Sequence, residues 1–144
     1  ICASANVVHL LRNRARPDLF SNALTPALLG ASMKTFELIA NGDALRAQLF
    51  RHAERFRAQM GDAGFDLLPG EHPIIPVMLG DAKLAGEMAA ALMEEGVYVT
   101  AFSFPVVPKG KARIRVQLSA AHNKEQLDKA IFAFVKVGKK LDVI

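Results

Sequence analysis

The chain has 144 residues, of which 51% are hydrophobic and 22% charged. This composition predicts one folded domain with a sizeable core and excludes a disordered chain. The single cysteine, Cys2, excludes an internal disulfide. The net charge of +4 comes from basic residues that are mixed with acidic ones and lack interleaved aromatic rings. We therefore expect small phosphorylated or carboxylated molecules as partners, and neither nucleic acid nor a membrane, since no apolar run reaches about 18 residues.

The N-terminal half is predicted to be helical. Its first residues contain no initiator methionine and no signal-peptide pattern, which we interpret as a fragment of a longer protein. Residues 7–14 resemble the end of a helix, and 16–22 are expected to form a loop. Thr25 and Pro26 predict the start of a helix that continues to about Ala40, because threonine caps helices and proline suits their first position.

A second long helix is expected to begin at Asp43 and to end at Gly61 and Gly64. Apolar residues recur along it at helical spacing and predict one buried face: Leu45, Leu49, Ala53, Phe56 and Met60. Four arginines surround this stripe: Arg46, Arg51, Arg55 and Arg57. They indicate either an ordinary solvated face or a surface that attracts phosphate groups.

The remainder alternates strands and helices. We expect strands at 74–79, 97–102 and 112–118, a helix at 82–95 and a final helix from Asn123. Asp81 is the expected cap of the first of these helices, and Asn123 with Gln126 forms a capping box on the second. The expected inward residues are Leu84, Met88 and Leu92 on one helix and Leu127, Ile131, Phe134 and Leu141 on the other. This order predicts a small mixed sheet with helices on one face.

The last predicted strand carries the most specific chemical pattern. Apolar and polar residues alternate, so that one face holds Ile114, Val116 and Leu118 and the other holds Arg113, Arg115 and Gln117. A guanidinium group is a planar fork that matches a carboxylate bidentately. The pattern therefore indicates either a small-carboxylate site or an exposed strand edge with ordinary ion pairs.

Other chemical signals are weak. The four histidines have no metal-like spacing, so no metal site is expected, and His72 and His122 are predicted to be surface or capping residues. No nucleophile elbow or glycine-rich phosphate loop is present. Ser21 and Asn22 are polar candidates, although loop chemistry alone would explain them.

Four segments together carry a family resemblance. They are Arg-Pro-Asp-Leu-Phe-Ser-Asn-Ala-Leu-Thr-Pro at 16–26, His-Pro-Ile-Ile-Pro-Val-Met-Leu-Gly-Asp at 72–81, Phe-Pro-Val-Val-Pro-Lys-Gly-Lys-Ala-Arg-Ile-Arg-Val-Gln at 104–117 and Ser-Ala-Ala-His at 119–122. In this order they resemble the C-terminal portion of the α-oxoamine synthases, pyridoxal-phosphate (PLP) enzymes that join an amino acid to an acyl-CoA.

The resemblance implies a fold and a domain organisation. The fold would be α+β, the C-terminal small domain of the PLP-dependent type I aminotransferase fold, with a three-stranded, mostly antiparallel sheet flanked by helices. Residues 1–42 would be an interdomain segment and a helix bordering a missing large PLP domain, and residues 43–144 would be the small domain.

The resemblance also implies an activity. The match favours the branch of the family that condenses glycine with acetyl-CoA to 2-amino-3-oxobutyrate, in threonine and glycine metabolism, as a homodimer with a shared cofactor site. Alternatives are another branch, of the 8-amino-7-oxononanoate synthase or serine palmitoyltransferase type, or a non-catalytic domain whose helix 43–60 docks an acidic partner. The bacterial cytoplasm and the mitochondrial matrix are both compatible compartments.

Residue roles follow from the same resemblance. Arg115 would bind the carboxylate of the amino-acid substrate, and Arg113 would support it. Ser21 and Asn22 would reach the cofactor phosphate of the neighbouring subunit. No residue matches the family's Schiff-base lysine, and Lys34 does not qualify because it lies downstream, inside a predicted helix. We therefore expect no catalytic residue in this chain and no acyltransferase activity from it alone.

Overall fold

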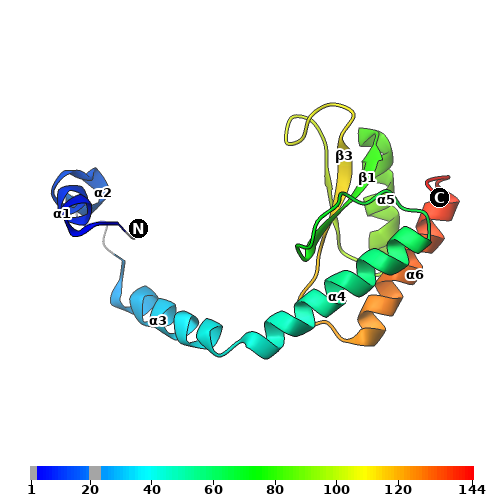
Figure 1. Cartoon of the computed structure of the whole chain (residues 1–144). Coiled ribbons are helices and arrows are strands. Elements are labelled where there is room, and N and C mark those ends of the chain that lie inside the picture. The colour runs from blue at the N-terminus through cyan, green and yellow to red at the C-terminus, as the bar shows by residue number, and fades with distance from the viewer. Residues whose placement is uncertain (1–2, 20–23) are drawn as a thin grey trace. The chain divides into compact units, whose positions relative to one another are not determined.

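The computed structural model describes residues 3–19 and 24–144, which divide into two compact units, 1–42 and 43–144 (Figure 1). The first unit contains α1 (Ala5–Arg14), α2 (Arg16–Leu19) and α3 (Pro26–Ala40). Residues 16–19 were expected in a loop, which is wrong: they form a short helix, because Pro17 lies in its first turn, where a backbone N–H is not needed.

Helix α3 begins as predicted, with the Thr25 hydroxyl accepting a hydrogen bond from the Leu28 N–H and Pro26 at the first position. No residue of α3 is buried. Its large apolar side chains are all more than half exposed: Leu28, Leu29, Met33, Phe36, Leu38 and Ile39. An apolar surface of this extent is typical of a helix that packs against further protein.

The second unit is built on a three-stranded sheet in the order β1 (Ile74–Gly80), β3 (Ala112–Gln117), β2 (Thr100–Phe102). Strand β3 lies in the centre and runs antiparallel to both neighbours. The α+β class and the antiparallel sheet are therefore confirmed. The mixed sheet expected from element order alone is wrong, because β3 separates β1 and β2, which would otherwise form a parallel pair. Strand β2 is also shorter than predicted, and residues 97–99 line a pocket instead.

Helices α4 (Asp43–Asp62), α5 (Ala82–Glu94) and α6 (Lys124–Lys140) complete this unit (Figure 1). The core takes alternate residues of the strands, Ile75 and Val77 from β1 and Ile114 and Val116 from β3. Phe134 of α6 lies at its centre, in edge-to-face contact with Phe56 and Phe65 at 6.0 Å between ring centroids. The arginines of β3 are thereby left on the opposite face.

Both predicted caps are present. The Asp81 carboxylate accepts a hydrogen bond from the Leu84 N–H at 2.8 Å, and the reciprocal bonds of the Asn123–Gln126 capping box measure 2.8 and 2.9 Å. The predicted apolar stripes need two corrections. Leu45 is 60% exposed, and Leu84 is only partly buried because the core stripe of α5 runs through Ala85, Met88 and Leu92. Leu141, at the C-terminal end of α6, packs against the core as predicted.

The arginines of α4 stabilise the fold. The Arg57 guanidinium donates to the backbone carbonyls of Leu68 and His72 at 2.9 and 3.2 Å, which ties the segment before β1 to the helix. Arg55 pairs with Asp128 of α6, and Arg46 pairs with Asp43. These contacts favour the structural interpretation of the arginines over a phosphate-attracting surface.

Candidate functional site

The outer face of the sheet, defined by the side chains that point away from the core, gathers the polar residues of β3. Residues directly opposite each other in a sheet share a face, and the register therefore places three rows together: Ile74, Pro76 and Met78 of β1, Gln117, Arg115 and Arg113 of β3, and Thr100 and Phe102 of β2. Arg115 lies in the middle of this face, opposite Pro76 on one side and Thr100 on the other.

The backbone at Arg115 is held by strand pairing, and Pro76 does not weaken it. The Pro76 carbonyl accepts a hydrogen bond from the Leu68 N–H at 3.1 Å, so the polar edge of Pro76 faces away from β3. A proline at this position removes no bond between β1 and β3. Arg115 thus projects from a central strand, which is a rigid base for a binding side chain.

The Arg115 side chain is exposed and makes one described contact. Its guanidinium carbon lies 4.6 Å from the centroid of the Phe102 ring. Within residues 3–19 and 24–144, no hydrogen bond or ion pair to the guanidinium is found. The N–H donors of Arg115 are therefore available to an anionic ligand, a carboxylate being the best geometric match.

Arg113 differs from Arg115 although it shares the strand and the face. It is partly buried, and its Nε donates to the Lys111 carbonyl at 3.2 Å. This bond turns the Arg113 side chain back toward the loop that precedes β3. In that loop the Lys109 ammonium lies 5.2 Å from the Phe104 ring centroid, and the Phe104–Pro105 peptide bond is cis.

Three other residues named from the sequence, Ser21, Asn22 and Lys34, belong to the first unit of the chain. Ser21 and Asn22 lie outside the described residues. Lys34 pairs with Glu37 on α3, in the other unit of the chain. The sequence pattern alone does not indicate Phe102, because its contact with Arg115 depends on the pairing of β2 with β3. The available signal was that Phe102 and Tyr98 are the two aromatic residues of the predicted strand 97–102.

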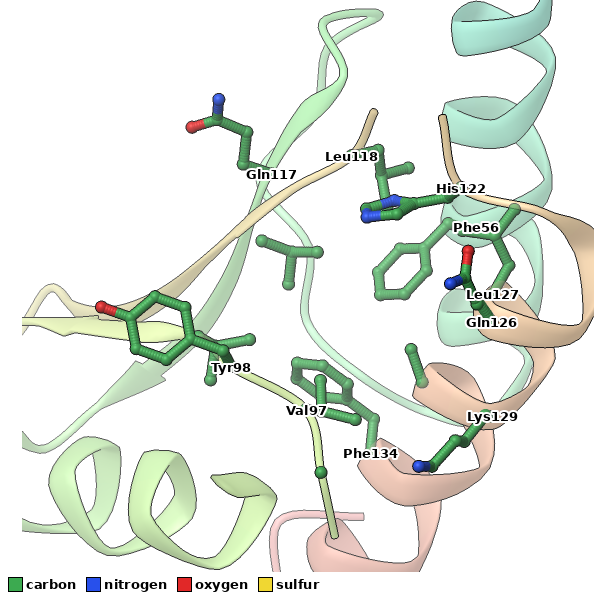
Figure 2. Close-up of a pocket in the computed structure, with 14 residues that line it drawn as sticks. Phe56, Val97, Tyr98, Gln117, Leu118, His122, Gln126, Leu127, Lys129 and Phe134 are labelled. Atoms are coloured by element: carbon green, nitrogen blue, oxygen red, sulfur yellow. The ribbon is translucent and has the colours of Figure 1, made fainter. Parts of the chain in front are cut away.

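A separate pocket of about 520 Å³ lies between the segment that leads into β2, the end of β3, and helices α4 and α6 (Figure 2). Its floor is apolar and includes Phe56, Leu127 and Phe134, while His122, Gln126 and Lys129 contribute polar groups. Arg115 is not among its lining residues, and the Gln117 side chain points away from it (Figure 2).

Two polar groups of this pocket already have structural roles. His122 Nδ1 accepts a hydrogen bond from the Ser119 N–H at 3.2 Å, and Gln126 Oε1 accepts from the Asn123 N–H. His72 acts similarly, with Nδ1 accepting from the Ile74 N–H at 3.1 Å. The prediction that His72 and His122 are surface or capping residues is confirmed, since His72 is exposed and His122 accepts a local backbone N–H. We therefore regard the outer face around Arg115 as the candidate site.

Two features are absent from the described residues. No helix in this part of the chain is long and apolar enough to cross a membrane. No group of three histidine, cysteine or acidic side chains among the same residues is arranged to hold a metal ion.

Comparisons with known proteins agree with the fold. The family model described as "Aminotransferase class I and II" matches residues 1–134. The chain is 54% identical over 142 residues to 2-amino-3-ketobutyrate coenzyme A ligase of Escherichia coli K12, covering 99% of this chain and 36% of that protein. It is 43% identical over 144 residues to 8-amino-7-oxononanoate synthase of Fervidobacterium nodosum, covering all of this chain and 36% of the relative.

Among solved structures, serine palmitoyltransferase of Sphingomonas wittichii superposes with a TM-score of 0.90 at 26% sequence identity. The match covers 99% of this chain and 36% of that one. The chain thus spans about a third of the length of these relatives, and its fold is that of the corresponding part of them.

Proposed function

Because the chain belongs to the aminotransferase class I and II family, we propose that it is the C-terminal part of a glycine C-acetyltransferase, also called 2-amino-3-ketobutyrate coenzyme A ligase. The whole protein would condense glycine with acetyl-CoA to 2-amino-3-oxobutyrate, in threonine and glycine metabolism. The observation that carries this proposal is the Arg115 guanidinium on the outer face of the sheet, which has no ion pair among the described residues, in a chain 54% identical to such an enzyme. The 43% identity to 8-amino-7-oxononanoate synthase supports that alternative less well.

In this proposal Arg115 binds the glycine carboxylate through two parallel N–H···O bonds. Such a bond pair fixes the orientation of the amino acid as well as its position. Arg113 adds positive charge to the same face. Its Nε is already bound to the Lys111 carbonyl, so that atom is not available to the substrate. The substrate is therefore held by a side chain on a rigid strand, while the reacting groups come from elsewhere in the protein.

The proposed cofactor of the whole protein is pyridoxal 5′-phosphate, which supplies an electron sink for carbanion chemistry when bound. The residues of this chain fit only part of such a site. Ser21 and Asn22 are proposed to contact its phosphate in the neighbouring subunit of a homodimer. The anchoring lysine is proposed to lie outside this chain, because no segment of it matches the family's lysine-bearing stretch and Lys34 lies inside α3. Residues 43–144 would form the small domain, and the exposed apolar surface of α3 supports packing of 1–42 against a larger domain.

The proposal is tested first by reading the coding sequence upstream of residue 1, which should encode a lysine-bearing cofactor domain. The full-length protein is then assayed for CoA release with each pair of substrates: glycine with acetyl-CoA, alanine with pimeloyl-CoA, and serine with palmitoyl-CoA. We expect turnover with the first pair and none from the 144-residue chain alone. A preference for another pair would transfer the protein to that branch of the family, and turnover by the short chain would overturn the assignment of its missing groups. The predicted compartments, bacterial cytoplasm or mitochondrial matrix, are tested by fractionation of the source cells.

A further inference from the structure

We propose that Phe102 is a positioning residue for Arg115: its ring holds the guanidinium in the orientation that binds the substrate carboxylate. This inference rests on the proposed function, which assigns the carboxylate to Arg115. The two residues lie on different strands, β2 and β3, and their contact at 4.6 Å is the one described interaction of the Arg115 side chain.

The strand register explains how the ring reaches the guanidinium. Phe102 is directly opposite Arg113, and Thr100 is directly opposite Arg115. Phe102 is therefore a diagonal neighbour of Arg115 on the same face, a separation that an aromatic side chain can bridge. Phe102 is partly buried, so its ring is better fixed than the exposed arginine that it contacts.

The contact with the ring uses no hydrogen bond of the guanidinium. The ring attracts the cation through its negative face, whereas a carboxylate binds the N–H donors, which lie in the guanidinium plane. The contact thus limits the rotamers of a long, exposed side chain without using any of its hydrogen bonds, which lowers the entropy lost on binding.

Arg113 does not receive the same support. It is opposite Phe102 in the register, yet its Nε is bound to the Lys111 carbonyl at 3.2 Å. The ring lies against the guanidinium two residues further along β3. The sheet thus distinguishes two arginines of one strand: the backbone holds Arg113, and an aromatic ring holds Arg115.

The chain contains a matched control. Phe104 lies two residues after Phe102, is 61% exposed, and contacts a different cation, Lys109, at 5.2 Å. Removing the Phe104 ring deletes the same kind of contact in the same segment without touching Arg115. A glycine KM that rises in both the Phe102 and the Phe104 variant would be due to the loss of an aromatic ring from this segment. A rise in the Phe102 variant alone would be due to the lost contact with Arg115.

The test uses the full-length enzyme and the variants Phe102→Met, Phe102→Tyr and Phe104→Met. Methionine fills a similar volume without a ring, and tyrosine keeps the ring. We expect Phe102→Met to raise the glycine KM about two- to five-fold, the value of an exposed cation–π contact, with kcat and the acetyl-CoA KM unchanged. Phe102→Tyr and Phe104→Met should each have the wild-type glycine KM. An unchanged glycine KM in Phe102→Met, or a variant that loses its fold or its cofactor, would overturn the proposal.

The Arg115→Ala background separates this inference from the proposed function. There, Phe102→Met should have no further effect on glycine affinity, measured from the cofactor absorbance during glycine titration. An equal effect in both backgrounds would show that Phe102 does not act through Arg115. A wild-type enzyme without glycine and acetyl-CoA turnover would refute the proposed function itself, whereas normal turnover with a silent Phe102→Met refutes only the positioning role.

Discussion

The inner and outer faces of the sheet are built from alternate residues of the same strands. On the inner face Ile75, Val77, Ile114 and Val116 pack into a core with α4, α5 and α6, and this packing is complete within the chain. On the outer face Arg115 has a ring beside it and no anionic partner among the described residues. The inner face therefore stabilises the unit, and the outer face presents charge that a ligand can use.

The largest expected effect lies on the inner face. Phe134→Ala should destabilise the second unit by about 3–5 kcal/mol, since it removes a fully buried ring that contacts Phe56 and Phe65. Urea unfolding of the 144-residue chain, followed by circular dichroism, measures this loss. Phe132→Ala on the same helix is the control, because that ring is 70% exposed and its removal should change stability far less. Equal losses would contradict the assigned core.

The largest expected effect on the outer face concerns binding. Arg115→Ala in the full-length enzyme should raise the glycine KM by the equivalent of about 2–5 kcal/mol, the cost of truncating one partner of a close charge pair. Cofactor binding should remain nearly intact, and the unfolding free energy should change by less than about 0.5 kcal/mol, because the side chain is exposed. Steady-state kinetics and a urea titration of the same preparation check both parts. A stability loss comparable to that of Phe134→Ala would show that Arg115 stabilises the fold, which would contradict its assignment as a binding residue.

A smaller effect is expected where α6 begins. Asn123→Ala removes the side chain that accepts from the Gln126 N–H at 2.8 Å and should cost about 1 kcal/mol of stability. The glycine KM should not change, because Asn123 precedes α6 and is not part of the sheet face that carries Arg115. A thermal melt of the variant measures the loss of stability. An assay of the full-length protein measures the glycine KM. A raised glycine KM would show that the two faces are coupled.

Local features of the fold were predictable from the sequence. Asp81 and Asn123 were identified as caps because capping depends on residues only a few positions apart. Alternation along 112–118 placed Arg113 and Arg115 on one face for the same reason.

Features that depend on distant pairing were not predictable in this way. Element order alone predicted a mixed sheet, because it does not determine that β3 inserts between β1 and β2. The contact of Phe102 with Arg115 needs the register of β2 on β3, and the different environments of the two arginines need the bond from Arg113 to the Lys111 carbonyl. The roles of Ser21 and Asn22 stay predictions.

The most direct test of the central claim compares Arg115→Ala with Arg113→Ala in the full-length protein. Glycine binding is measured for both variants and the wild type by titration of the cofactor absorbance. Our account predicts at least about a 30-fold loss of glycine affinity for Arg115→Ala, the equivalent of 2 kcal/mol, and a much smaller loss for Arg113→Ala. An unchanged affinity in Arg115→Ala, or a larger loss in Arg113→Ala, would contradict the assignment of Arg115 as the carboxylate-binding residue.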